Sequence, residues 1–144
     1  MIKRVLVLLF LLVFLILYFT QEPENLTIVK QRYIKLLEYL NTDACPEEFH
    51  SLREYTIITG RTHIINGDIG YNTNKGTEIG VCLGDPNDMF HVLLHELAHS
   101  TVSEYTHSDQ FWKNFNKLKE ICVNLGIYTR ITQRRRFCNK YIVD

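Results

Sequence analysis

Five residues in the second half of the chain, His95-Glu96-Leu97-Ala98-His99, constrain its fold more than any other stretch. Each residue of an α-helix turns by about 100°, so His95 and His99 lie one turn apart on the same face. Glu96 projects about 60° to the side of His99. Leucine and alanine fill the other positions, which favours a buried helix. The sequence therefore predicts a rigid helix with two imidazoles directed at one point and a carboxylate beside them.

This spacing is the H-E-x-x-H pattern, in which two histidines bind zinc and the glutamate serves as a general base. Glu96 is therefore the predicted catalytic residue, because it can take a proton from a water molecule held at Zn²⁺. Coincidence is the alternative interpretation, since two histidines and a glutamate can also share a purely structural helix. The helical context favours the zinc site.

A catalytic zinc site usually has three protein ligands and one open position. His107 is the best candidate for the third ligand, because it follows His99 by eight residues and precedes the next predicted helix. Glu104 and Asp109 are the alternatives, since carboxylates also bind zinc. The predicted ligand set is His95, His99 and His107.

Three other histidines fall outside this set. His91 lies one turn before His95, but histidines at i, i+4 and i+8 span about 12 Å, too far for bonds of about 2 Å to one ion. We expect His91 to support the site or simply to pack in the core. His50 and His63 have no motif around them and are expected at surface or strand positions.

An unbroken apolar run from Val5 to Phe19 follows a short basic start. The run is slightly shorter than the roughly 20 residues that span a bilayer, but Ile2 and Thr20 can extend it. No small-residue cleavage site follows, which favours an uncleaved transmembrane signal-anchor over residues 1–21. Residues 22–144 would form the folded domain. The basic start predicts a single-pass membrane protein with a cytoplasmic N-terminus and its domain on the far side.

The charge balance of the domain excludes a strongly basic protein. Removing Lys3 and Arg4 from the 16 basic residues leaves 14, against 16 acidic ones. This balance argues against a general nucleic-acid-binding protein. The C-terminal tail is nevertheless basic, which predicts either a solvated tail or a patch for an anionic partner. Its basic residues are Arg130, Arg134, Arg135, Arg136 and Lys140.

Four cysteines, Cys45, Cys82, Cys122 and Cys138, show no C-x-x-C spacing, which argues against a second zinc site built from cysteine. In an oxidising compartment they could form two disulfides, whose pairing the sequence does not assign. Buried free thiols are the alternative.

Apolar spacing and turn residues predict the remaining elements. Helices are predicted over Thr27–Asn41, Pro86–Thr101 and Ser108–Leu125, with one further turn over Phe49–Leu52. Strands are predicted over Tyr55–Thr59, Arg61–Ile65, Thr77–Leu83 and Ile127–Ile131, with a turn at Asn66–Asp68 and loop or irregular strand over Ile69–Gly76. Asp85 and Ser108 are expected to cap their helices. The predicted fold class is α+β: a small mixed β-sheet packed on the metal helix and further helices, plus an N-terminal transmembrane helix.

These motifs together resemble the WLM family of zincin metallopeptidases. The matching residues are Gly70, Asn72, Asn74 and Gly76 before a strand, then Leu94-His95-Glu96-Leu97-Ala98-His99, then His107 with the aromatic pair Phe111 and Trp112. The resemblance covers roughly residues 30–125, and the chain is more loosely similar to the SprT-like proteases of DNA–protein crosslink repair. It implies a zincin-like fold, Zn²⁺ as cofactor and peptide-bond hydrolysis. Known members act near DNA through extra recognition tails, so the repair role is not carried over to a chain with a membrane segment.

The resulting hypothesis is a membrane-anchored zinc metallopeptidase that acts on a protein or peptide. The strand Thr77–Leu83 would offer an edge to which an extended substrate adds as another strand. The alternative is a membrane-anchored protein-binding module with a structural or vestigial zinc site, although such a module has no need of Glu96. A zinc hydrolase acting on a non-peptide amide is a third possibility.

Overall fold

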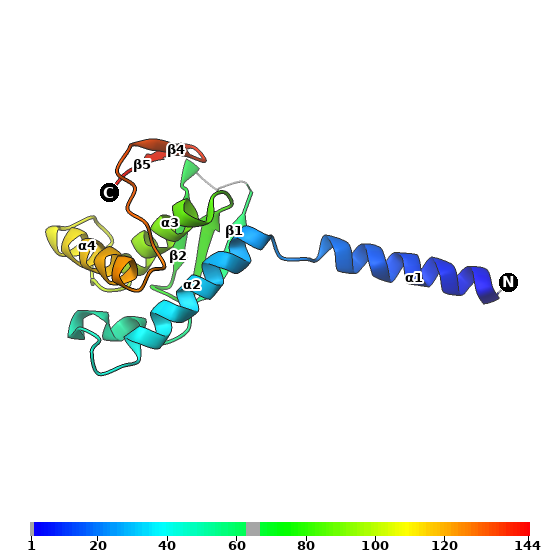
Figure 1. The fold of residues 1–144 in the computed structure, drawn as a ribbon, viewed down its shortest axis with the longest axis horizontal. Helices are drawn as coiled ribbons and strands as arrows, with labels where there is room; N and C mark the ends of the chain where they lie inside the picture. Colours follow the sequence, from blue (N-terminus) through cyan, green and yellow to red (C-terminus); the bar gives the residue numbers. More distant parts are fainter. Residues whose placement is uncertain (1, 63–66) are drawn as a thin grey trace.

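The computed structural model describes residues 2–62 and 67–144, which form several helices around two small sheets (Figure 1). In chain order the elements are α1 (Ile2–Phe19), α2 (Glu24–Leu40), the 3₁₀ helix η1 (Glu47–Leu52), β1 (Ile57–Arg61), β2 (Gly70–Thr73), β3 (Glu78–Cys82), α3 (Pro86–His99), α4 (Asp109–Asn124), β4 (Arg135–Phe137) and β5 (Lys140–Ile142). The chain is thus α+β, as predicted. His63 and most of the predicted strand Arg61–Ile65 lie outside the described residues, as does Asn66, the first residue of the predicted turn.

Helix α1 extends away from the rest of the molecule and buries no side chain (Figure 1). It is long and apolar enough to cross a membrane. A helix whose whole surface is apolar and unburied is stable only in a lipid-like environment or against a partner. Its position and length agree with the apolar run read from the sequence.

The three-stranded sheet has β3 in its centre, with β1 parallel on one side and β2 antiparallel on the other. Ile58 pairs with Ile79, and Gly70 pairs with Val81. The prediction that Thr77–Leu83 offers an exposed edge is therefore wrong, because both sides of that strand are already paired. The edge beside α3 is β2, whose glycine and asparagine content had predicted loop or irregular strand.

Helix α3 is the central element of the domain. Every residue from Asp88 to Leu94 is buried, because the sheet lies on one side of the helix and α4 on the other, with α2 also in contact (Figure 1). Full burial of one leucine or phenylalanine side chain stabilises a fold by about 1.5–3 kcal/mol. The helix that carries the H-E-x-x-H pattern is thus held rigidly on nearly all of its faces.

The two helices of the motif begin at the predicted capping residues. The Asp85 carboxylate accepts hydrogen bonds from the backbone N–H groups of Asn87 and Asp88, at 2.9 and 3.3 Å. The Ser108 hydroxyl accepts one from the N–H of Phe111 at 3.1 Å. Each such cap is worth about 1 kcal/mol. The apolar stripe of α4 is buried, and α4 packs against α3.

The C-terminal region differs from its prediction. The strand predicted over Ile127–Ile131 is wrong, because that segment is extended coil whose apolar side chains are buried. Strands form further along instead, as the antiparallel hairpin of β4 and β5 (Figure 1). Charged residues in this hairpin masked the strand pattern, since only Phe137 and Ile142 of its strands are buried. Residues 127–144 are called the C-terminal arm below.

Candidate metal centre and cleft

Three histidines meet at one point between α3 and the start of α4. Nε2 of His107 lies 3.0 Å from Nε2 of His95 and 3.1 Å from Nε2 of His99. His95 and His99 stand one turn apart on α3, and the loop after α3 folds back to bring His107 over them. The structure therefore places the three predicted ligand residues within 4.8 Å of one another.

Hydrogen bonding alone does not account for this arrangement. One N–H at Nε2 of His107 can be donated to only one of its two neighbours. Tetrahedral zinc with Zn–N bonds of about 2.0–2.1 Å would hold its ligand nitrogens about 3.3 Å apart. Burial and, to a lesser extent, the neighbouring histidines lower the pKa of His95 to about 3. Burial also lowers the pKa of His99. Converging neutral imidazoles at this spacing fit a zinc ion.

An aromatic pair at the start of α4 holds the imidazoles in place. The ring centre of Phe111 lies 4.4 Å from that of His99, 4.7 Å from that of His107 and 5.0 Å from that of His95. Trp112 packs against His107 at 5.4 Å. These two residues follow His107 by four and five positions, so the same helix start fixes the third histidine and the floor beneath all three.

Glu96 points into the same cavity from the side that faces β2. A Cβ on Gly70 would lie only 2.9 Å from Oε1 of Glu96, so glycine at this position leaves room for the carboxylate. Glu96 is 9% exposed, and its carboxylate has no hydrogen-bond partner among residues 2–62 and 67–144. Burial raises its pKa to about 7, with a further contribution from Asp68 that Lys140 opposes. A carboxyl group in this state is suited to exchange protons near neutral pH.

Asn72 fixes the edge strand to the helix of the motif. Its Nδ2 donates to the backbone oxygen of Glu96 at 2.7 Å and to Oγ of Ser100 at 2.8 Å, and its Oδ1 accepts from the N–H of Gly76 at 2.6 Å. Gly76 has a φ of 111°, a conformation that favours glycine. The glycine–asparagine segment thus clamps β2 beside Glu96, a role that its composition alone did not reveal.

A cavity of about 540 Å³ contains the histidines, Glu96 and the inner end of the arm. Its walls are β2 on one side, α4 with Trp112 and Phe115 on another, and the arm from Lys140 to Val143 on the third. His91 lies at its floor. The arm had no predicted part in the site, because nothing in its sequence spacing indicates that it returns to α3.

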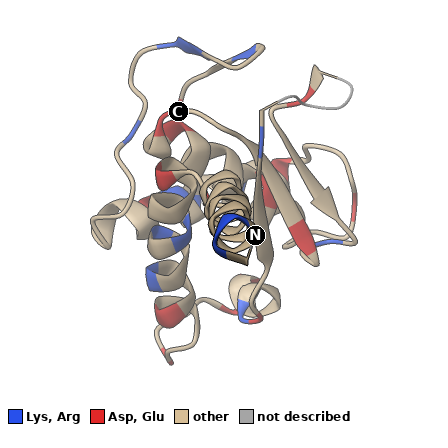
Figure 2. Ribbon diagram, turned by 90° about the vertical axis from the view of Figure 1, so that its right-hand side faces the viewer, with Lys and Arg blue, Asp and Glu red and all other residues tan. Residues whose placement is uncertain are grey.

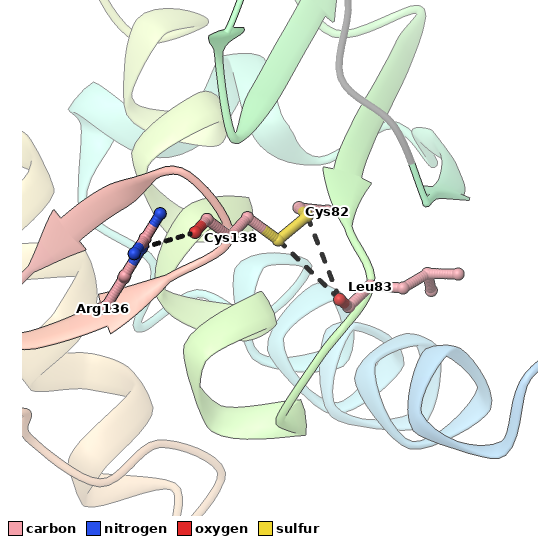
Figure 3. The surroundings of a disulfide bond; sticks show 4 residues. All are labelled: Cys82, Leu83, Arg136 and Cys138. Atoms are coloured by element: carbon pink, nitrogen blue, oxygen red, sulfur yellow. Dashed lines mark hydrogen bonds between the residues drawn. A yellow bond between two sulfur atoms is a disulfide. The ribbon is translucent and has the colours of Figure 1, made fainter.

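Covalent and ionic links tie the arm to the rest of the domain. A disulfide joins Cys82 at the end of β3 to Cys138 in the hairpin turn (Figure 3). Arg135 pairs with Asp88 at the start of α3, and Lys140 pairs with Asp68. Three basic residues of the tail therefore have acidic partners, since Arg130 also pairs with Glu120, and α4 carries side chains of both signs (Figure 2).

The sequence left open whether the four cysteines form two disulfides or remain buried thiols, and the structure has one disulfide and two thiols. Cys45 and Cys122 are free and buried. Burial raises the pKa of the Cys122 thiol, which leaves it inert.

The other predicted candidates lie away from the three histidines. Glu104 accepts hydrogen bonds from Ser103 and Ser108, and Asp109 occupies the first turn of α4. Neither belongs to the cluster of ligand atoms found in the described part of the chain. His50 is exposed on η1.

Comparison with known proteins places this geometry in a family. The family model of the WLM domain matches residues 60–138, which is more than half of the chain. The chain belongs to the WLM family. WLM is the SprT-like, zincin-related family, and its members are related to zinc metallopeptidases. The WLM match begins later than the resemblance read from the sequence and runs on into the C-terminal arm as far as Cys138.

This chain is also similar to the uncharacterized protein R325 of Acanthamoeba polyphaga mimivirus. It is 38% identical over 69 residues, which cover 42% of this chain and 35% of that protein. This chain thus spans about a third of the length of that relative. No solved structure matches.

Proposed function

We propose that this protein is a zinc-dependent metallopeptidase with a zincin-like domain over residues 22–144 and a membrane anchor over residues 1–21. The observation that carries the proposal is the convergence of Nε2 of His95, His99 and His107, with the unpaired carboxylate of Glu96 in the same cavity. The three imidazoles would hold Zn²⁺. When bound, Zn²⁺ supplies Lewis-acid chemistry, lowering the pKa of water and polarising a carbonyl.

Glu96 would act as the general base. Its carboxylate takes a proton from the attacking water and then delivers that proton to the leaving amine. Gly70 leaves free the space beside the Glu96 carboxylate that a Cβ would occupy. Asn72 holds the backbone of Glu96 and thereby fixes the distance between this base and β2.

The substrate would bind as an extended chain along β2. This strand is paired with β3 on one side only, and Ile69, Gly70 and Tyr71 line the cavity. An extended peptide can add to such an edge through backbone hydrogen bonds. β2 therefore takes the role that the sequence had suggested for Thr77–Leu83.

The anchor would place the domain outside the cytoplasm. Lys3 and Arg4 lie in the first turn of α1, ahead of its apolar run, which favours a cytoplasmic N-terminus. The disulfide between Cys82 and Cys138 agrees with a domain on the opposite, oxidising side. Glycosidase or protease accessibility in sealed vesicles would test this orientation.

Matched variants of the full chain in detergent test the enzyme. Glu96→Gln keeps the three ligands, so we expect unchanged zinc content and at least a 100-fold loss of peptide hydrolysis. His107→Ala should lose zinc and activity together. Glu38→Gln, an exposed position on α2, makes the same chemical change away from the cleft and should have full activity. Full activity in Glu96→Gln would exclude the proposed mechanism.

The same experiment addresses the rival function. A protein-binding module with structural zinc would also contain zinc in wild type and would unfold when zinc is removed. Such a module would hydrolyse no peptide, so wild type and all variants would be equally inactive. The buried, unpaired Glu96 favours the enzyme, since a binding module gains nothing from a desolvated carboxylate that lacks a partner.

A further inference from the structure

The cavity continues past the three histidines to a second polar group. His91 lies one helical turn below His95, about 6 Å along the axis of α3. It lines the same cavity and is only 7% exposed. Between the two levels the walls are apolar, formed by Val92, Phe115 and Ile142. The ring centre of Phe115 lies 5.4 Å from those of both His91 and His95, so the cavity has an apolar surface between the candidate reaction centre and His91.

The hydrogen bonds on one side of His91 determine which ring nitrogen carries its proton. Nδ1 lies 2.9 Å from the hydroxyl of Tyr128, which is itself 2.9 Å from both carboxylate oxygens of Asp144. A tyrosine hydroxyl has one hydrogen, and the ionised carboxylate can only accept it. The hydroxyl must therefore accept a hydrogen from Nδ1 of His91.

A neutral imidazole has only one N–H, so Nε2 of His91 carries a lone pair. Burial lowers the pKa of His91 to about 4, against the opposing effect of Asp144, so the ring is neutral at pH 7. Lys119 already neutralises Asp144 through a contact of 2.8 Å. Within the described chain, Nε2 has no hydrogen-bond partner. An acceptor of a largely buried residue therefore has no protein partner on the wall of an open cavity.

We infer that His91 is a specificity-determining residue, whose Nε2 accepts a hydrogen bond from a substrate side chain that is apolar along its length and ends in an O–H donor, as tyrosine does. This inference rests on the proposed function for the identity of the substrate as a peptide. Lysine and arginine side chains are disfavoured because the apolar walls of the cavity would desolvate their charge. A carboxylate is disfavoured because it has no hydrogen to donate. Serine and threonine are too short to reach one helical turn below His95.

Phenylalanine is the critical comparison, because it fills the same space and leaves Nε2 unpaired. An unpaired buried polar group discriminates strongly between such substrates. We expect about a tenfold preference for tyrosine over phenylalanine next to the scissile bond.

Ligand binding tests this inference without any need for catalysis. Trp112 is the only tryptophan of the chain and lines the cavity, so its fluorescence reports binding. Zinc-loaded full-length protein in detergent is titrated with N-acetyl-tyrosinamide and with N-acetyl-phenylalaninamide. The tyrosine probe should bind about tenfold more tightly to wild type, and His91→Phe should abolish the difference. Equal affinities in wild type would overturn the inference.

A second measurement applies to wild type alone, in case His91→Phe does not fold. In protein labelled with ¹⁵N-histidine, a two-bond ¹H–¹⁵N spectrum should show the His91 proton on Nδ1, and the Nε2 signal should move with the tyrosine probe only. A proton on Nε2 would overturn the inference.

Peptide cleavage separates this inference from the proposed function. Cleavage of matched peptides at equal rates for tyrosine and phenylalanine would refute the role of His91 and leave the peptidase intact. Tyrosine-selective binding without cleavage would support the pocket and refute the peptidase.

Discussion

Two walls of the same cleft are built in different ways. Helices α3 and α4, with the loop between them, carry the histidines and Glu96, and the facing sides of the two helices are buried. The C-terminal arm supplies the opposite wall. It buries Ile127, Tyr128, Ile131, Phe137 and Ile142, and it is held in addition by a disulfide, by ion pairs and by Asp144. Apolar packing alone thus fixes the reacting groups, while covalent and ionic links add to the packing that shapes the pocket around them.

This difference implies that the two walls can be damaged separately. A change inside α3 or α4 should disturb stability and metal binding together, because the histidines stand on the packed surface. A change in the arm should alter substrate binding and local stability while zinc stays bound. The following experiments challenge this division, from the largest expected effect to the smallest.

Phe111→Ala removes the ring that lies beneath all three histidines. Phe111 is fully buried, and truncation of such a residue costs about 3–5 kcal/mol. We expect a loss of this size in urea unfolding and a clearly weaker zinc affinity by competition with a chelator. Tyr141→Ala is the control on the other wall: it is 61% exposed and should change stability by about 0.5 kcal/mol or less. Unchanged zinc affinity in Phe111→Ala would show that the aromatic floor does not position the ligands.

Replacing Cys82 and Cys138 by serine should release the arm. The two residues are 56 positions apart, and a loop of this length loses about 3–4 kcal/mol when the bond is removed. Zinc content should persist, while KM for a peptide substrate should rise. Reductant should reproduce these changes in wild type and have no further effect on the double variant. A loss of zinc on reduction would contradict the separation of the two walls.

The sequence predicts the wall formed by α3 and α4 well, because the residues that define it lie close together in the chain. His95, Glu96 and His99 lie within five residues, and Asp85 and Ser108 mark the helix starts by capping chemistry that acts over two or three positions. Helical geometry then places these groups without knowledge of the rest of the fold.

The arm could not be predicted in this way, because its partners are remote in sequence. Arg135 pairs with a residue 47 positions away, and Lys140 with one 72 positions away. The sequences of β4 and β5 also contain charged residues and lack the alternation of apolar and polar residues that indicates a strand. The edge strand β2 was hidden for a related reason: Gly70 and Asn72 are chosen for close contact with α3, and such residues are typical of loops.

Asp144→Asn tests the buried anchor of the arm. Burial raises the pKa of this carboxyl group, but hydrogen bonds from Lys119, the N–H of Ile131 and Tyr128 outweigh that effect and lower it overall. A lowered pKa stabilises the fold above the unfolded value of about 3.9, and the contribution is lost as the pH falls through the folded pKa. We expect a loss of about 2–3 kcal/mol at pH 7 that shrinks towards pH 3. A difference in urea unfolding that is equal at both pH values would contradict this assignment.

Lys140→Ala should have the smallest effect on stability and therefore isolates the function of the arm. The pair with Asp68 is half exposed on both sides, and such pairs contribute about 0–1 kcal/mol. Lys140 nevertheless lines the mouth of the cavity. Because the disulfide and Asp144 still hold the hairpin, we expect a melting temperature close to that of wild type and a change confined to KM. If kcat and zinc affinity fell as well, the arm would contribute to the metal centre itself, and the proposed division between the α3–α4 wall and the C-terminal arm would be wrong.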